Sequence, residues 1–253
     1  MTNDETDATS GPQAIPEMCH HCFDVLIDKL QNSAFTERNS SQAVDDMPAF
    51  ADHLDDVTVQ CPLFITWDKQ PHKSALSSSR KRNHGHYELR GCIGNLSPQL
   101  LVTAIGAYAL TSALRDHRFE PIQLGEVASL RVAVSLLVNY EPCKDAFDWT
   151  VGIHGIMIKF HTDSGAFYSA TFLPEVAGER RWSVMETLTA LIQKAGYNGI
   201  IDDQLLASIK CTRYQSSKRR MTFRDYVKQC HQGENPINLT QPRSKSTQQC
   251  VHL

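Results

Sequence analysis

The order of the apolar segments constrains this chain most, because strand-like runs follow one another without a helix between every pair. Apolar or β-branched runs of strand length occupy residues 62–67, 88–93, 131–139, 155–161, 166–173 and 208–214. A parallel sheet needs a long crossover, usually a helix, between successive strands, and the sequence lacks that regular alternation. The pattern therefore predicts an α+β fold whose sheet is largely antiparallel and flanked by helices.

Helices are expected where capping residues precede apolar side chains at helical spacing. A first helix is expected over 16–30, with an apolar face formed by Cys22, Val25, Leu26 and Leu30. Ser97-Pro98 offers an N-cap and a proline at the first helical position, so it predicts a second helix that ends near Arg115. Ser183 and Glu186 form a capping box that opens a third helix. Shorter helices are expected over 202–207 and 222–228.

Polar stretches set the expected domain boundaries. Residues 1–15 and 232–253 are rich in polar residues, so we expect disordered tails on either side of one domain that spans 16–231. A third polar stretch, 69–86, contains a run of serines and basic residues and predicts a mobile insertion. Residues 162–165 have the composition of a hairpin turn between two strands.

Composition and motifs exclude several functional classes. Of the 253 residues, 41% are hydrophobic and 21% are charged, which suits a globular domain with a sizeable core. We find no run of eighteen apolar residues and no secretory signal, and eight cysteines in such a chain indicate a reduced, intracellular protein. The motifs of P-loop nucleotide hydrolases, dinucleotide-binding enzymes, serine esterases and zinc proteases do not occur.

Charge is distributed unevenly along the chain. The first 60 residues contain twelve acidic and two basic residues, whereas residues 209–228 contain seven basic residues against Asp225. The basic cluster, which includes Arg213 and Lys218, is a candidate surface for phosphates or acidic partners, or it is a solvated surface. The stacking aromatic residues and glycines of an RNA-binding module are missing, which favours the solvated surface over nucleic-acid binding.

The segment 89–94, with the sequence Leu-Arg-Gly-Cys-Ile-Gly, is the strongest candidate for chemistry. In a strand, Arg90 and Cys92 point to the same face, and a guanidinium beside a thiol favours the thiolate. The second expected helix would place its N-terminus near Cys92 and lower the pKa of the thiol further. Gly91 and Gly94 would let a ligand or a neighbouring backbone approach closely. The alternative is a small core cysteine beside glycines that serve packing.

His154, Asp116 and Arg118 are further candidates. His154 lies between glycines at the start of an expected strand, and its intrinsic pKa suits a general acid or base for Cys92. The alternative is a buried histidine whose hydrogen bonds are satisfied within the fold. Asp116 and Arg118 follow the second expected helix, where they either brace the local turn or shape the rim of a site.

Cys19-His20-His21-Cys22 has the spacing of half a zinc site. No second pair follows at matching spacing, and helical periodicity places Cys19 and Cys22 on the apolar face of the first helix. The sequence therefore predicts core cysteines, without a metal or a cofactor.

The segment 89–94 resembles the signature of the AMMECR family, and the resemblance extends from about residue 18 to residue 230. Further matching residues follow in order at 17–19, 22–26, 63–67, 110–114, 116, 118–119, 148–149, 151–152, 154–156, 173–177, 213–214, 216 and 218. The sequence departs from the family pattern at Asn95-Leu96, at Ser217 and in the longer connection 69–86. The resemblance implies an α+β fold of two unequal lobes and an intracellular role, and animal members of the family are associated with the nucleus.

In prokaryotes, domains similar to this family occur beside or fused to Memo-like domains and radical S-adenosylmethionine enzymes. The resemblance therefore implies a modification or regulatory process and a Memo-like protein as the candidate partner. Nucleic acid remains the alternative partner, through the basic cluster at 209–228.

Two hypotheses about function follow. In the first, the chain is an enzyme with Cys92 as nucleophile or redox thiol, Arg90 as anion clamp and His154 as acid or base. In the second, it is a non-catalytic interaction module that binds through the signature cleft and the basic cluster. Substrate or partner contacts are assigned to Gly91, Gly94, Asp116, Arg118, Arg213 and Lys218. Rapid alkylation of Cys92 below pH 7 would indicate the enzyme.

The last four residues, Cys250-Val251-His252-Leu253, have the outline of a prenylation box. His252 occupies a position that is normally aliphatic, and only Arg243 and Lys245 supply basic charge upstream. A single lipid without a polybasic partner binds membranes reversibly. We therefore expect no stable membrane association.

Overall fold

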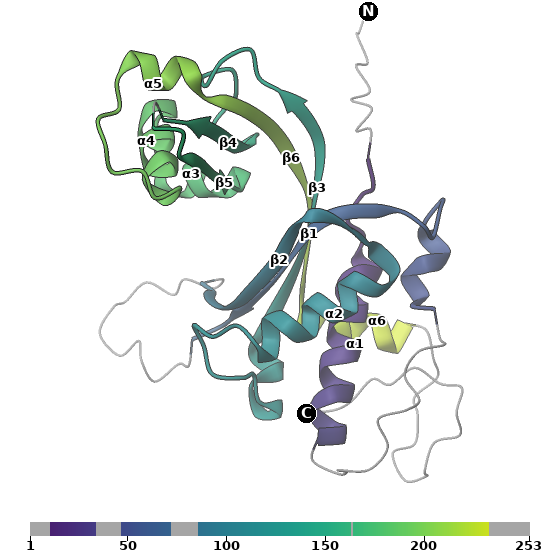
Figure 1. Cartoon of the computed structure of the whole chain (residues 1–253). Coiled ribbons are helices and arrows are strands. Elements are labelled where there is room, and N and C mark those ends of the chain that lie inside the picture. The colour runs from purple at the N-terminus through teal and green to yellow at the C-terminus, as the bar shows by residue number, and fades with distance from the viewer. Residues whose placement is uncertain (1–10, 34–46, 72–85, 163, 233–253) are drawn as a thin grey trace, which may run out of the picture. The chain divides into compact units, whose positions relative to one another are not determined.

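A computed structural model describes residues 11–33, 47–71, 86–162 and 164–232 (Figure 1). The described residues form one six-stranded sheet with the strand order β2-β1-β3-β6-β4-β5. The pairs β1–β2, β1–β3, β4–β5 and β4–β6 are all antiparallel, and helices flank the strands, so the predicted α+β fold is confirmed. The strands are β1 (Gln60–Lys69), β2 (Glu88–Leu100), β3 (Leu130–Pro142), β4 (Gly155–His161), β5 (Phe167–Phe172) and β6 (Lys210–Thr222).

All five expected helices are present, although some of their ends differ from the expectation. The α-helices are α1 (Pro16–Ser33), α2 (Leu101–Leu114), α3 (Pro174–Arg180), α4 (Val184–Lys194), α5 (Asp203–Ser208) and α6 (Phe223–Gln232). Two short 3-10 helices, η1 (Ala49–His53) and η3 (Leu124–Ser129), and the helix α3 have no counterpart in the predicted elements. None of the described helices is both long enough and apolar enough to cross a lipid bilayer.

The described chain divides into two compact units of unequal size. The smaller unit contains the described residues of 1–12 and 137–217, and the larger unit contains those of 13–136 and 218–253. β3 and β6 each contribute residues to both units. Most of the expected tails and insertion, at residues 1–10, 72–85 and 233–253, lies outside the described residues, and so does the C-terminal Cys250.

The core of the larger unit forms where α1 packs on α2 and on the sheet. Helical spacing puts Cys19, Cys22 and Phe23 of α1 on one face, and all three are fully buried. The ring of Phe23 lies 5.2 Å from that of Trp67 in β1 and 5.1 Å from that of Tyr226 in α6. The prediction that Cys19 and Cys22 are core residues is therefore confirmed.

The core of the smaller unit lies between α4 and the β4–β5 hairpin. α4 begins at the predicted capping box, in which Ser183 Oγ accepts from the Glu186 N–H at 3.2 Å and Glu186 Oε2 accepts from the Ser183 N–H at 2.8 Å. This cap fixes where α4 begins, and the spacing of its apolar residues decides which face is buried. The buried side chains include Leu188, Leu191, Ile192, Ile156, Ile158 and Phe160.

The expected start of the second helix is wrong. β2 continues through Ser97-Pro98 to Leu100, and α2 begins at Leu101. The register between β1 and β2 moves from Leu63 opposite Asn95 to Cys61 opposite Gln99, so β2 carries extra residues at this point. A strand tolerates proline at such an irregularity, so Pro98 lies within β2 and does not start a helix.

Candidate functional site

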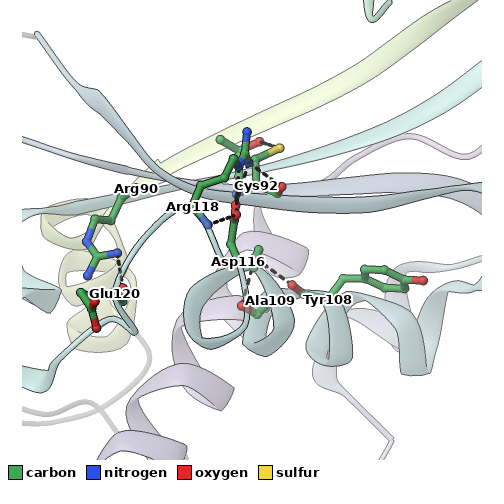
Figure 2. A network of polar contacts seen from close by, with 9 residues as sticks. Arg90, Cys92, Tyr108, Ala109, Asp116, Arg118 and Glu120 are labelled. Carbon is green, nitrogen blue, oxygen red and sulfur yellow. Dashed lines mark hydrogen bonds and ion pairs between the residues drawn. The ribbon is translucent and has the colours of Figure 1, made fainter. Parts of the chain in front are cut away.

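Cys92 lies on β2, an edge strand of the sheet, and the larger unit closes that edge with side chains. The Cys92 N–H donates to Asp116 Oδ2 at 2.9 Å, and Arg118 Nη2 donates to the Cys92 carbonyl at 3.1 Å (Figure 2). These backbone groups would otherwise be open to pairing with another strand. Asp116 and Arg118 thus take the place of a neighbouring strand at Cys92.

Asp116 and Arg118 also form a forked ion pair. Arg118 Nη2 lies 2.7 Å from Asp116 Oδ2, and Arg118 Nε lies 2.9 Å from Asp116 Oδ1. The Asp116 side chain is 4% exposed, whereas that of Arg118 is 57% exposed. Hydrogen bonds from Arg118 and from the Cys92 N–H hold the pKa of Asp116 far below its ordinary value, against the effect of burial. A buried carboxylate therefore holds a guanidinium at the surface in a fixed orientation.

The Cys92 thiol is half-buried and accepts a hydrogen bond from the residue opposite it on β1. Thr66 lies directly opposite Cys92 in the β1–β2 register, and its hydroxyl donates to Cys92 Sγ at 3.1 Å. Burial raises the pKa of the Cys92 thiol, although the Thr66 hydroxyl and the charges of Arg118 and Lys218 lower it in part. The expected thiolate is therefore wrong, because the cost of burying the charge exceeds the help from nearby cations.

Arg90 does not stabilise the thiolate, because a bulge separates it from Cys92. Gly91 pairs with Trp67, but the next partner of β1, Asp68, pairs with Leu89, so Arg90 is an extra residue in β2. An extra residue breaks the alternation of side chains across the strand. Figure 2 shows the Arg90 guanidinium and the Cys92 sulfur on opposite sides of the strand. The expectation that they share a face is wrong.

Arg90 instead anchors the segment that leads into η3. Its Nη2 lies 2.7 Å from Glu126 Oε1, and its Nη1 donates to the Glu120 carbonyl at 2.6 Å. Lys69 Nζ lies 2.5 Å from the other oxygen of the Glu126 carboxylate. The Arg90 side chain is 15% exposed, so its charge is largely committed to this network.

Gly91 allows β2 to pass close to α2. A Cβ atom at Gly91 would overlap the carbonyl oxygen of Ser112, in the last turn of α2. The strand therefore passes the C-terminal end of the helix, where the helix dipole is negative, and not the N-terminal end that the sequence predicted. Gly94 serves a close approach of a different kind, because a Cβ there would overlap the Leu63 carbonyl and the ring of Phe64.

His154 and Arg213 belong to the smaller unit, whereas Cys92, Arg90 and Lys218 belong to the larger one. His154 Nδ1 accepts from the Thr150 N–H at 3.0 Å, and burial followed by the charge of Arg213 lowers the pKa of the imidazole. The acid or base role of His154 toward Cys92 stays a prediction.

Arg213 is held by two carboxylates of its own unit. Its Nη2 lies 2.8 Å from Glu141 Oε2 and its Nη1 lies 3.0 Å from Asp148 Oδ1. Nη1 also donates to the Asp148 carbonyl at 2.9 Å. These bonds tie β6 to the end of β3 and to the segment after it.

Cys19 and Cys22 have the environment of core thiols. Burial raises the pKa of Cys19 to about 12 and that of Cys22 well above its ordinary value. Cys19 Sγ donates to the Arg219 carbonyl at 3.4 Å. Within the part of the chain that the structure describes, no three His, Cys, Asp or Glu side chains are placed to hold a metal ion together.

Two residues of the site have no signal in the sequence strong enough to find them. Thr66 was part of an expected strand, but its contact with Cys92 depends on the register between β1 and β2. Glu126 forms a capping box with Gln123 at the start of η3, and glutamine is an uncommon first residue for that motif. Thr66 could have been identified only from the register between β1 and β2, and Glu126 only from its capping box with Gln123.

Comparison with known proteins places this geometry in a family. The chain is 40% identical over 214 residues to an uncharacterised protein of Arabidopsis thaliana, which covers 83% of this chain and 86% of that protein. It is 38% identical over 212 residues to an uncharacterised protein of Schizosaccharomyces pombe, covering 83% of this chain and 94% of that protein.

The fold is also found in a solved structure. The crystal structure of an uncharacterised protein from Pyrococcus horikoshii matches with a TM-score of 0.55 at 22% identity, covering 83% of this chain and 93% of that one. Residues 19–219, which include Cys92, Asp116 and Arg118, match the AMMECR1 family. This chain is a member of the AMMECR1 family.

Proposed function

We propose that this chain recognises an anionic group, a carboxylate or a phosphate of its ligand, at Arg118 and Lys218 beside the Cys92 thiol. The observation that carries the proposal is the contrast in exposure within one ion pair. The Arg118 side chain is 57% exposed, whereas the Asp116 carboxylate that orients it is 4% exposed.

An arginine held in this way is suited to anion recognition. Arg118 Nε and Nη2 donate to Asp116 and to the Cys92 carbonyl, so Nη1 is the atom that would meet a carboxylate or phosphate oxygen. A guanidinium already fixed by Asp116 loses little conformational freedom when a ligand binds. The charges of Arg118 and Lys218 both lower the pKa of the Cys92 thiol, so both cations act on the surroundings of the sulfur. Two such cations favour an anion of one or two charges.

The surroundings of the Cys92 thiol favour recognition over nucleophilic catalysis. The hydroxyl of Thr66 donates to the sulfur, so it does not accept the thiol proton as a general base would. Burial raises the pKa of Cys92, which leaves little thiolate at neutral pH. In this proposal the thiol forms part of the wall of the binding site.

One observation still favours the hypothesis that Cys92 is a catalytic thiol. Arg118, Lys218 and the Thr66 hydroxyl all lower the pKa of Cys92, so removing the cost of burial would leave a reactive thiol. A ligand that changes the solvation of the sulfur would have this effect. The pH at which Cys92 becomes reactive therefore separates the two hypotheses.

The proposal also fits the partner expected from the resemblance. A Memo-like protein or a modified protein would offer its carboxylates or phosphates to Arg118 and Lys218. The nuclear or cytoplasmic location and the identity of the partner stay predictions.

Alkylating reagents of different charge test the anion site directly. Iodoacetate carries a carboxylate and iodoacetamide does not, so an anion site beside the thiol should raise the ratio of their rates at Cys92. We expect a ratio about threefold or more above that of a blocked free cysteine at low salt. The tryptic peptide 91–115 contains Cys92 as its only cysteine and reports both rates by mass spectrometry.

Variants of the guanidinium supply the controls. Arg118→Ala should reduce the ratio to that of the free cysteine, Arg118→Lys should restore part of it, and inorganic phosphate should lower the iodoacetate rate in wild type. Arg224→Ala, at an exposed arginine on α6, is the matched control and should leave the ratio unchanged. A ratio that is the same in wild type and Arg118→Ala contradicts the proposal.

A further inference from the structure

Two cysteines, Cys143 and Cys211, meet in the smaller unit. Cys143 follows the last residue of β3, and Cys211 is the second residue of β6. The Cys143 N–H donates to the Cys211 carbonyl at 3.0 Å, which holds the residue after β3 beside β6, the neighbouring strand of the sheet. Neither residue belongs to the anion site.

The side chains of the two cysteines are also in contact. The Cys143 and Cys211 thiols form a hydrogen bond with each other, and both cysteines are reduced in the structure. The backbone hydrogen bond and the contact between the thiols bring the two residues within reach of a disulfide, which spans Cα separations of about 4.4 to 6.8 Å.

We propose that Cys143 and Cys211 form a reversible dithiol–disulfide pair, whose oxidant is a low-molecular-weight disulfide such as oxidised glutathione. In the first step the Cys143 sulfur attacks the glutathione disulfide, which gives a mixed disulfide and releases one glutathione that takes the Cys143 proton. In the second step the Cys211 sulfur attacks the Cys143 sulfur, and the second glutathione leaves with the Cys211 proton. Two protein thiols are oxidised and one glutathione disulfide is reduced.

Exposure determines the order of the two steps. Cys143 is half-buried at the margin of the apolar core, whereas Cys211 is 5% exposed within it. A dissolved disulfide reaches the more exposed thiol first, and the buried neighbour then resolves the adduct. Burial also raises the pKa of Cys211, which fits a thiol that does not react with reagents in solution.

The bond would fix the segment that carries His154. This segment begins after Cys143 and includes Asp148, which pairs with Arg213 two residues beyond Cys211 on β6. A disulfide would add a covalent link beside the ion pair and the backbone hydrogen bond that Arg213 forms with Asp148. We therefore expect oxidation to restrain the segment from Lys144 to His154 further.

Peptide mapping of the full chain tests the proposal. Trypsin cleaves after Arg131, Lys144, Lys210 and Arg213, so residues 132–144 and 211–213 form two peptides with one cysteine each. After equilibration with oxidised glutathione and alkylation of the remaining thiols, these two peptides should appear joined. The joined pair should form at least about tenfold more in the folded chain than in urea, because only the fold holds the thiols together.

The thermal midpoint gives a second measurement. Oxidation should raise the midpoint by about 5 °C or more in wild type, because the bond closes a long loop of the unfolded chain. Cys143→Ser should abolish both the joined peptides and the shift, and it spares the buried Cys211. Cys61→Ala, which removes a thiol of the larger unit, should keep both.

Three outcomes would overturn the proposal. Glutathione on Cys143 without joined peptides would mean that Cys211 does not resolve the adduct. Unmodified thiols throughout would mean that the pair is not reached by a dissolved disulfide. Equal yields of joined peptides in folded and urea-treated chains would mean that the fold does not bring the thiols together.

Discussion

Each unit contains an arginine held by acidic side chains, one in the larger unit and two in the smaller, and the two ion-pair groups differ in which partner is buried. In the larger unit a carboxylate that is 4% exposed holds Arg118, whose side chain is 57% exposed. In the smaller unit Arg213 is 27% exposed, and its partners Glu141 and Asp148 are 55% and 31% exposed. Arg118 therefore presents its charge to solvent, whereas Arg213 forms ion pairs with two carboxylates.

The difference shows when an arginine that already forms an ion pair can still bind a further anion. Arg213 joins the end of β3 to β6 and has two carboxylates to neutralise it, so an incoming anion would have to compete with both. Arg118 has one carboxylate, which also accepts from the Cys92 N–H. We infer that the ion pair of Arg118 serves recognition and that the ion pairs of Arg213 serve structure.

The largest expected difference between the two units is the loss of unfolding free energy when a glycine of each unit is replaced by alanine. Gly91→Ala should cost about 3 kcal/mol or more of unfolding free energy, because the new Cβ overlaps a backbone oxygen of α2. Gly152→Ala, near the ion pairs of Arg213, should cost about 1 kcal/mol, because its φ is +82° but no atom lies within 4 Å of the new Cβ.

Urea unfolding of both glycine variants measures these costs. Equal costs would show that β2 and α2 are not in the close contact on which the Cys92 site depends.

The next largest difference is the loss of stability when the aspartate that binds each arginine is replaced by asparagine. Asp116→Asn should lower the unfolding free energy by about 2 kcal/mol at pH 7, because a buried acceptor of two donors is lost. Asp148→Asn should have a much smaller effect, because Asp148 is 31% exposed and Arg213 keeps Glu141. Chemical denaturation at pH 7 compares the two.

The pH dependence of the stability of Asp116→Asn and wild type shows in which direction the pKa of Asp116 is shifted. The folded-state pKa of Asp116 lies below the ordinary value of 3.8, so its stabilisation is complete above that value and is lost as the pH falls below it. The gap between wild type and Asp116→Asn should therefore narrow at low pH. A gap that is constant from pH 7 to pH 3 would mean that Asp116 has an ordinary pKa.

Local signals predicted much of the fold. The apolar spacing of α1, the capping box of α4 and the turn between β4 and β5 depend on residues close in sequence, and each element occurs where it was expected. Ser97-Pro98 had an equally good local signal for a helix start, but pairing with β1 keeps these residues in β2. Tertiary pairing outweighs a local cap of about 1 kcal/mol.

The candidate site was less predictable than the fold. Cys92, Asp116 and Arg118 were found from the sequence, but the faces of Arg90 and Cys92 depend on a bulge that alternation does not reveal. The direction of the Cys92 pKa shift depends on burial, which follows from packing across the whole unit. Residue types indicated the members of the site, whereas their charge states required the structure.

The smallest expected effect concerns His154. Burial and Arg213 lower the pKa of His154 below 6.5, so it should be neutral at pH 7, and the stability it contributes should be lost as the pH falls through its folded-state pKa. An NMR titration should give a midpoint below 6.5. Arg213→Gln should raise the midpoint, because it removes a cation and leaves the carboxylates of Glu141 and Asp148.

A midpoint of His154 that does not move in Arg213→Gln would mean that the imidazole and Arg213 are not coupled. That result would weaken the inference that Arg213 and its two carboxylates serve the structure of the segment that carries His154.

The most direct test of the central account is the pH profile of Cys92 alkylation. Recognition by Arg118 beside a neutral thiol predicts that the iodoacetamide rate at Cys92 rises about tenfold per pH unit up to at least pH 9, because the pKa of the thiol lies above its ordinary value of 9.0. The profile is read from the tryptic peptide 91–115 of the folded chain. A rate that reaches its plateau below pH 7 would contradict the account and identify Cys92 as an activated nucleophile.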